Sequence, residues 1–282
     1  MPLRALHTPE CIAVCRVGQD AALAVQNAPS DKRPFLHPIL SPDCTAILTE
    51  DAPPHHPWQH GLYVGLNDVN GVGFWTEGLH TKENDGSFRP APLQSPAVRG
   101  ECAEWSVETE WLAPDKSGML AETQRWRLTD NRRGAEFVLD LEWKLTARID
   151  LAFGKYAYGG LFLRMPYNPE LGGSALNSEG LKNNAAEAQR ARWVAVSMPV
   201  AAAAGGRAVA GMAIMDHPTN PEHPVPYRVD GQLGIGPSRC IVGAWSLKVG
   251  SCATFKHRVL VFNGEADPAR VNANWDDWTK NF

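Results

Sequence analysis

The chain has 282 residues, of which 44% are hydrophobic and 21% are charged, and it contains ten tryptophans. This composition is typical of a folded globular protein with a sizeable core, and it excludes a disordered chain. The formal net charge of -4 and the pI near 6.1 provide no long-range attraction for a polyanion. We therefore expect no nucleic-acid partner.

Membrane and redox signals are also absent from the sequence. No segment approaches the length of an apolar membrane span, and the first eight residues lack the apolar core of a secretory signal. We therefore expect a cytoplasmic location and no membrane partner. The six cysteines stand singly, without a Cys-x-x-Cys pair, which argues against a zinc finger or a disulfide framework. No interface signature indicates an oligomeric state.

Alternation of apolar and polar residues is the main secondary-structure signal. It is clearest over 135–148, where Leu141, Trp143 and Leu145 alternate with polar side chains, as expected for a half-buried strand. Similar patterns predict further strands, over 104–113, 253–262, 62–66, 160–165, 192–198 and 240–249.

These strands, the 22 prolines and the lack of a glycine-rich phosphate loop predict an all-β sandwich with few short helices. One helix is expected at the C-terminus. Asp267 is a suitable N-cap, Pro268 suits the first helical position, and Trp275 and Trp278 recur at helical spacing. No repeat or composition break divides the chain, so we expect residues 1–282 to form a single domain.

Histidines carry the strongest functional signal. Three of the nine lie in one proline-flanked run, at His55, His56 and His60. Imidazole titrates near neutral pH, so histidines held in rigid loops favour proton transfer or metal binding. Pro57 excludes a helical metal motif of the HExxH kind, and the run is predicted to be a loop that leads into the strand 62–66.

A second proline-rich run, 216–224, contains Asp216 and His217. His37, like His60 and His217, is followed by a proline or a glycine near a predicted strand end. Because one rim of a sandwich gathers strand ends, we expect His37, His60 and His217 to lie close enough to share one ligand.

Aromatic rings near the first histidine run favour a sugar ligand. A ring face beside hydrogen-bonding groups holds the apolar side of a sugar while its hydroxyl groups are recognised. For each tryptophan alone, packing in the sandwich core is the alternative. Arg164 is a candidate anchor for a substrate carboxylate, and Glu179 is a further carboxylate candidate. The predicted substrate-binding residues are His55, His56, Trp58, Trp75, Arg164 and Glu179.

Several segments together resemble a known family, the soluble proteins catalogued as methane oxygenase PmoA. The matching pieces, which extend from about Arg33 to the C-terminus, are Arg33-Pro34-Phe35-Leu36-His37-Pro38, His55-His56-Pro57-Trp58-Gln59-His60-Gly61-Leu62, Phe74-Trp75, Gly159-Gly160-Leu161, Asn177-Ser178-Glu179-Gly180, Ala191-Arg192-Trp193-Val194 and Asp216-His217-Pro218-Thr219-Asn220-Pro221.

The resemblance implies a sandwich of the galactose mutarotase-like type, a supersandwich in which histidines and a carboxylate move protons on a sugar. It also implies a role in carbohydrate breakdown. Methane oxidation in a membrane is not expected, because the chain has no predicted membrane span. The family pattern does not assign catalytic residues.

Three functions are therefore open. The first is a carbohydrate-active lyase, hydrolase or epimerase in which His60 and His217 act as acid and base, and His37 and Asp216 orient them. The second is a metalloprotein with a divalent zinc, iron or copper ion bound by His37, His60 and His217. The third is a carbohydrate-binding module without catalysis. In the first and third the partner is a small carbohydrate; the cofactor and the substrate stay undetermined.

Overall fold

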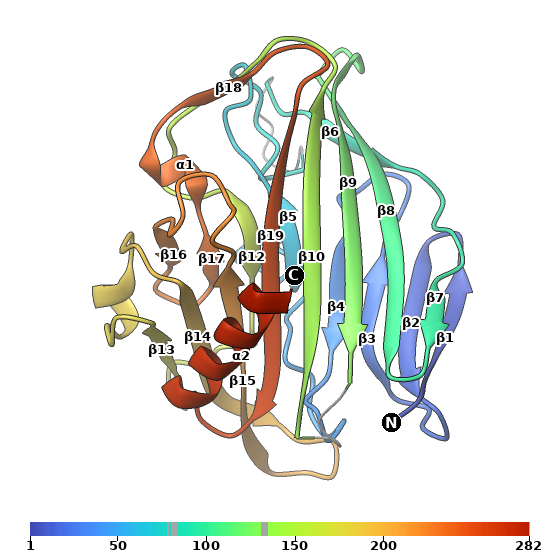
Figure 1. The fold of residues 1–282 in the computed structure, drawn as a ribbon, viewed down its shortest axis with the longest axis vertical. Helices are drawn as coiled ribbons and strands as arrows, with labels where there is room; N and C mark the ends of the chain where they lie inside the picture. Colours follow the sequence, from blue (N-terminus) through green and yellow to red (C-terminus); the bar gives the residue numbers. More distant parts are fainter. Residues whose placement is uncertain (78, 80–83, 131–134, 282) are drawn as a thin grey trace.

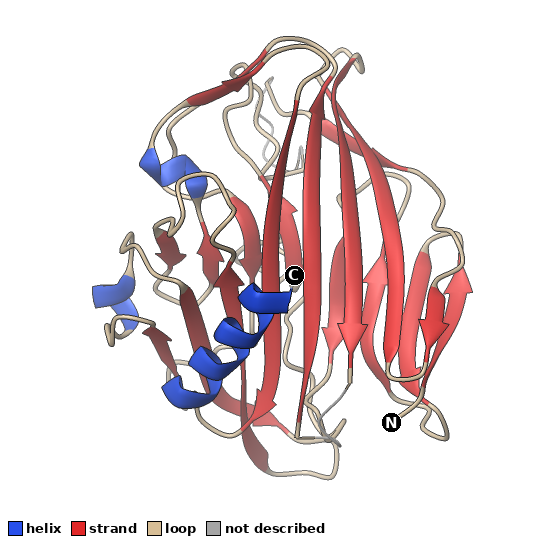
Figure 2. Cartoon of the chain, in the orientation of Figure 1, coloured by secondary structure: helices blue, strands red, loops and turns tan. Residues whose placement is uncertain are grey.

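The computed structural model describes residues 1–77, 79, 84–130 and 135–281. Two large antiparallel sheets lie face to face, with a few short helices at their edges and on one outer face (Figure 1 and Figure 2). The prediction of an all-β sandwich with few short helices is confirmed. None of the described helices is long and apolar enough to cross a membrane.

The first sheet contains eight strands in the described part of the chain. In spatial order they are β1 (Leu3–Thr8), β2 (Cys11–Arg16), β3 (Ala22–Asn27), β4 (Phe35–Ile39), β5 (Leu62–Gly65), β12 (Gly160–Leu163), β17 (Ile235–Pro237) and β16 (Tyr227–Val229).

The second sheet contains nine described strands, and most of them are longer. In spatial order they are β13 (Ser174–Asn177), β14 (Trp193–Ala201), β15 (Arg207–Asp216), β19 (Cys252–Asn263), β10 (Glu136–Ala147), β9 (Gly118–Thr129), β8 (Cys102–Leu112) and β6 (Ser87–Pro90), with β7 (Ala97–Arg99) also paired to β8. The remaining elements are the pair β11 (Leu151–Phe153) and β18 (Trp245–Leu247), the 3-10 helix η1 (Asn183–Ala186), and the helices α1 (Arg239–Val242) and α2 (Pro268–Asn281).

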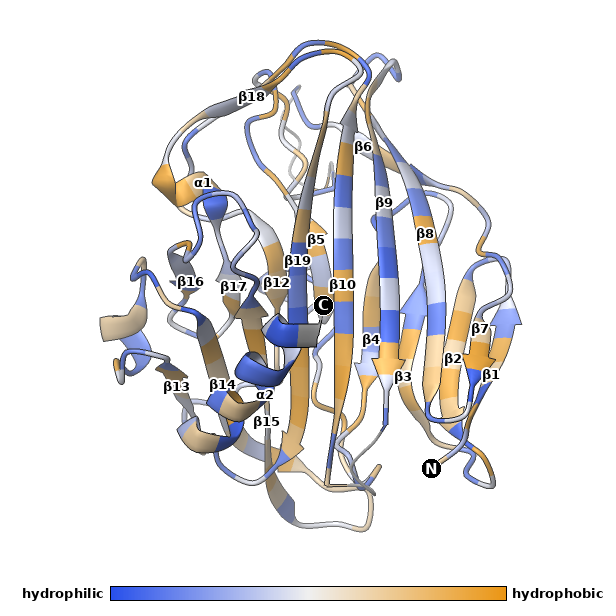
Figure 3. Cartoon of the chain, in the orientation of Figure 1, coloured by the Kyte–Doolittle hydropathy of each residue, from blue (hydrophilic) through white to orange (hydrophobic). Residues whose placement is uncertain are grey.

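The main core lies between the two sheets. Successive side chains of a strand point to opposite faces, so the alternation along β8 and β10, visible as alternating colours in Figure 3, places one apolar face against the opposite sheet. Leu141 and Leu145 of β10 are buried in this core, to which Leu62 and Val64 of β5 contribute from the other sheet. Each such buried side chain stabilises the fold by about 1.5–3 kcal/mol.

A second, smaller core covers the outer face of the nine-stranded sheet. Helix α2 lies across this face in Figure 1, and its Val271 and Trp278 are buried against Leu260 and Phe262 of β19. The predicted C-terminal helix is therefore confirmed. The amide of Ala269 donates a hydrogen bond to the Asp267 carboxylate, 3.0 Å away, as expected of an N-cap.

The strand prediction was wrong over 240–249, and it missed the strands β1–β4, β6, β7, β9, β11, β13 and β15–β17. The predicted strand 240–249 is interrupted, because helix α1 occupies its beginning and only β18 is extended. Strand β9 escaped prediction because its inner face carries the polar residues Glu122 and Gln124 beside Trp126. Glu122 is stabilised inside the core by hydrogen bonds from the indole nitrogens of Trp111 and Trp143, at 3.1 and 2.6 Å.

A buried ion pair connects the two sheets. Arg16, at the end of β2, donates two hydrogen bonds to Asp130, just after β9, at 2.6 and 3.0 Å. The two side chains are 2% and 0% exposed, so neither charge is solvated by water. Arg16 therefore depends on Asp130 for compensation, while Asp130 also lies 3.8 Å from the amino terminus of Met1.

Asp130→Ala is expected to lower the free energy of unfolding by about 3–5 kcal/mol, because it leaves a buried guanidinium without a counter-charge. Urea unfolding monitored by tryptophan fluorescence measures this change. The matched control is Glu104→Ala, which breaks the exposed pair with Arg127 and should cost at most about 1 kcal/mol. Equal losses in the two variants would contradict this account.

Candidate functional site

The outer face of the eight-stranded sheet carries an aromatic cluster. Leu62 and Val64 of β5 point into the main core, so Tyr63, between them, points outward. Phe35 of β4 and Phe162 of β12 are its cross-strand neighbours. These outward rings form a cluster that is separate from the main core.

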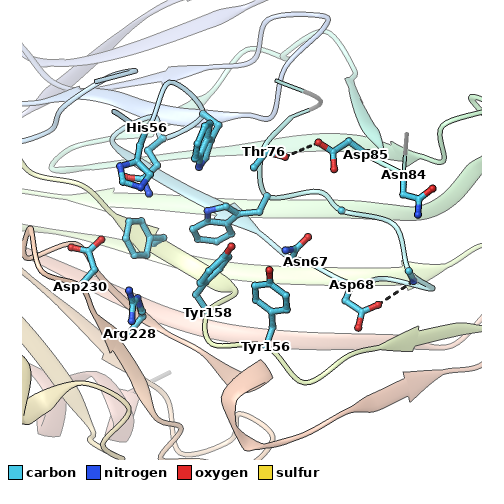
Figure 4. A pocket seen from close by; sticks show the side chains of 16 residues that line it. His56, Asn67, Asp68, Thr76, Asn84, Asp85, Tyr156, Tyr158, Arg228 and Asp230 are labelled. Carbon is cyan, nitrogen blue, oxygen red and sulfur yellow. Dashed lines mark hydrogen bonds between the residues drawn. The ribbon is translucent and has the colours of Figure 1, made fainter. Parts of the chain in front are cut away.

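A cavity of about 760 Å³ opens above this cluster (Figure 4). Its floor consists of Trp75, Tyr158 and Phe162, with ring centroids 4.5 Å apart for Trp75 and Tyr158 and 5.5 Å apart for Trp75 and Phe162. Trp58 and His56 form part of the wall, in edge-to-face contact at 5.4 Å. The volume lies in the range of about 300–1,000 Å³ that is typical of small-molecule sites.

Polar groups stand at both ends of the floor. In Figure 4, His56, Asp230 and Arg228 lie at one end, and Asp68 and Asn84 lie at the other. Asn67, Thr76 and Asp85 complete the second end, and Tyr156 stands beside Tyr158 with the rings edge to face at 4.8 Å. We call this cavity, its aromatic floor and its two polar ends the outer-face pocket.

Arg164 lies beneath the outer-face pocket and does not line it. Its side chain is 1% exposed and donates to Gln59 at 2.7 Å and to Asp230 at 2.8 Å. Both acceptors line the pocket. The prediction that Arg164 anchors a substrate carboxylate is therefore not supported by its position, because its guanidinium already binds a carboxylate of the protein.

His60 is buried between two carboxylates, of which Glu77 is also buried and Asp51 lies at the surface. Its Nδ1 lies 2.6 Å from Asp51 and its Nε2 lies 3.0 Å from Glu77. Arg33 binds the other oxygen of Glu77 at 2.5 Å. The His60 ring also stacks on Phe35, with centroids 4.7 Å apart. His60 does not line the pocket, but it connects the loop that carries His56 and Trp58 to the segment that carries Trp75 and Thr76.

The two carboxylates change the protonation of His60. Burial alone would lower the pKa of the imidazole, but the hydrogen bonds to Asp51 and Glu77 outweigh it and raise the pKa. Burial would raise the pKa of Glu77, but Arg33 and His60 hold it at about 2. Each imidazole nitrogen faces a carboxylate of the protein, at 2.6 and 3.0 Å, so both positions at which a metal or a substrate could bind are occupied.

His37 lies near His60 but binds elsewhere. Its Nδ1 is 2.9 Å from the Thr49 hydroxyl. Burial lowers the pKa of His37 and outweighs the Asp51 carboxylate, which acts in the opposite direction. His37 therefore favours the neutral form, and it does not line the outer-face pocket.

Asp216 and His217 belong to the other sheet, at the end of β15, and point in opposite directions. Asp216 is buried, faces inward beside His257, and accepts hydrogen bonds from Asn220 at 2.7 Å and His223 at 2.8 Å. His217 faces outward and packs edge to face on Trp278 of α2 at 4.8 Å. Neither residue lines the outer-face pocket.

The expected convergence of His37, His60 and His217 was wrong. The reason is that His217 follows a strand of the nine-stranded sheet and packs under α2, whereas His37 lies in β4 of the eight-stranded sheet and His60 lies just before β5 of that sheet. The described residues contain no group of three or more His, Cys, Asp or Glu side chains that could hold a metal ion. The predicted metal ligands therefore do not fit a common metal ion.

The predicted substrate-binding residues divide in the structure. His56, Trp58 and Trp75 line the outer-face pocket. His55 is exposed beside it, with Nε2 2.5 Å from the Gln232 side chain. Glu179 lies in an exposed turn after β13, where it accepts a hydrogen bond from Ser178 at 2.8 Å, and it does not line the pocket.

Several pocket residues were missed in the sequence. Short sequence patterns could have indicated some of them. The dipeptide Asn-Asp occurs at 67–68 and again at 84–85, and both copies line the pocket. Tyr156 and Tyr158 are two positions apart, as are Arg228 and Asp230, and each pair lines the pocket. In an extended chain, that spacing places both members on the same face.

A model of a protein family of unknown function, DUF6807, matches residues 17–276. The chain belongs to this family. The resemblance to the PmoA family was therefore wrong, since the matching model is that of DUF6807 and nothing in the comparisons indicates PmoA membership. No curated protein matches the chain.

Solved structures that are similar to the chain include α-galactosidases. The GH36 α-galactosidase AgaA of Geobacillus stearothermophilus, in complex with 1-deoxygalactonojirimycin, has a TM-score of 0.34 and 12% identity over 93% of this chain and 40% of its own. The α-galactosidase of Lactobacillus brevis has a TM-score of 0.32 and 12% identity over 94% and 39%. The DUF6807 chain thus spans about 40% of the length of these proteins.

The His60 chain predicts a pH-dependent stability. A group whose pKa is raised on folding stabilises the native state below its unfolded pKa of about 6.5, and this contribution is lost as the pH rises through the folded value. We expect His60→Gln to be less stable than the wild type, with the largest difference near pH 6 and a smaller one near pH 9. Urea unfolding at several pH values measures it; a difference independent of pH would contradict the protonated His60.

Proposed function

We propose that this DUF6807 protein binds a carbohydrate in the outer-face pocket and acts on it as a lyase, hydrolase or epimerase by acid/base catalysis. The observation that carries the proposal is the aromatic floor of Trp75, Tyr158 and Phe162 between two polar ends. A sugar ring has an apolar face that stacks on such a floor and a rim of hydroxyl groups that carboxylates and amides bind.

The acid/base groups that the pocket itself offers differ from those expected in the sequence. Among the described residues, His56 is the histidine that lines the pocket, and Asp68, Asp85 and Asp230 are its carboxylates. A proton-transfer group must reach the substrate within hydrogen-bond distance. We therefore assign proton transfer to His56 with a carboxylate of the opposite end, in place of His60 and His217.

A carbohydrate-binding module without catalysis is the second candidate, supported by the same floor. Both candidates predict that the protein binds a glycoside, but only the enzyme converts it into a product. A panel of plain and keto-glycosides, incubated with the protein and followed by chromatography, separates them. Product formation supports the enzyme, and binding without product supports the module.

Removing a floor ring should weaken binding. We expect Tyr158→Ala to raise the dissociation constant of a bound glycoside by about tenfold, because an aromatic contact contributes about 1.5 kcal/mol at most beyond its buried area. Isothermal titration calorimetry measures it. The matched control is Tyr167→Ala, a partly buried tyrosine outside the pocket, which should bind as the wild type does. Unchanged affinity in Tyr158→Ala would place the ligand elsewhere.

For a glycoside that is turned over, His56→Ala should lower kcat by about 10²–10⁴-fold while the protein stays folded, because a positioned proton-transfer group contributes about that much. His217→Ala is the matched control, since His217 packs under α2 outside the pocket, and it should keep kcat within a few fold. A larger loss of kcat in His217→Ala than in His56→Ala would instead indicate that His217 transfers the proton.

A further inference from the structure

The two ends of the outer-face pocket differ in charge compensation. At the His56 end, Asp230 pairs with the buried Arg164 at 2.8 Å, and Arg228 pairs with Glu187, so each charge has an opposite partner. At the other end, Asp85 accepts a hydrogen bond from the Thr76 hydroxyl at 2.7 Å.

Asp68 at the same end accepts one from the Gly71 amide at 3.1 Å. Within the described ranges, neither Asp68 nor Asp85 forms an ion pair with a lysine, arginine or histidine. Among the described residues, the second end therefore carries two carboxylates and no paired cation.

The Asp85 and Asp68 carboxylates each pack against the backbone of a glycine, at Gly73 and Gly154 respectively. A Cβ atom on Gly73 would lie 2.7 Å from an Asp85 oxygen and 3.0 Å from the Asn67 amide oxygen. A Cβ atom on Gly154 would lie 1.7 Å from an Asp68 oxygen. The two glycines leave room for these side chains to pack closely, so both carboxylates line the pocket, Asp85 partly buried and Asp68 exposed at its rim.

Resting on the sugar site proposed above, we infer that the pocket selects sugars by charge: it binds amino sugars most tightly, neutral sugars less tightly, and uronic acids least. The ammonium group of the amino sugar lies at the Asp68 and Asp85 end while the ring stacks on Trp75 and Tyr158. Carboxylates without a counter-charge attract a cation and repel an anion across a cavity of this size. Arg228 is the competing anchor for an acidic sugar, but Glu187 already neutralises it.

The test is a matched series of methyl glycosides that differ in one group: amino, hydroxyl or carboxylate, each in the gluco and galacto configurations. Calorimetry at about pH 6, where the sugar amine is charged, measures the three affinities. We expect each step in the order amino, neutral, acidic to cost about fivefold, as for partly exposed charges, and the steps to shrink as salt is raised.

The double variant Asp68→Asn/Asp85→Asn removes the charge and keeps the side-chain size. It should bring the three affinities within about twofold of one another. The control Asp115→Asn removes a carboxylate from an exposed turn between β8 and β9 and should leave the order unchanged. Either single variant gives an intermediate result, and circular dichroism shows whether each protein is folded.

The binding results distinguish a failure of the sugar site from a failure of the charge selection. If none of the glycosides binds, the proposed sugar site is overturned and this inference with it. If all three bind with equal affinity, the sugar site stands and the charge selection is overturned. If the uronic acid binds most tightly, Arg228 determines the specificity, and the assignment to Asp68 and Asp85 is overturned.

Discussion

A chain of opposite charges, buried at Arg33, Glu77 and His60 and reaching the surface at Asp51, holds the outer-face pocket together. Arg33, Glu77, His60 and Asp51 alternate in sign, and each bonds to the next within 3.0 Å. A buried charge without a partner is costly, so the segments that carry these groups cannot separate without a large penalty. The floor residue Trp75 and the wall residue Trp58 lie on those segments. The shape of the pocket therefore depends on interactions outside it.

The eight-stranded sheet supports two environments because side chains alternate along its strands. On β5, one face contributes to the main core and the other carries Tyr63, on which the aromatic cluster is built. A rigid sheet under an aromatic floor loses little entropy on binding a ring. Arg164 likewise holds polar groups of the pocket in place, because it donates hydrogen bonds to Gln59 and Asp230 from below.

The histidines illustrate how neighbours in sequence separate in space. His56 lines the pocket, whereas His60, four residues later, is enclosed by two carboxylates. Asp216 faces the interior and His217 faces α2, because adjacent residues of an extended chain point to opposite faces. A shared proline-rich context thus did not indicate a shared site.

The sequence by itself determined the fold class and several elements. Period-two alternation gave β8, β10 and β19, and the Asp267-Pro268 start gave α2, because these patterns depend on neighbours within a few residues. It also indicated the loop with His56 and Trp58 and the floor residue Trp75. Only the tertiary structure decided that Asp68, Asp85, Tyr158 and Asp230 join them. Those residues come from loops and strands far apart in the chain, and local patterns carry no information about which distant segments meet across a sheet.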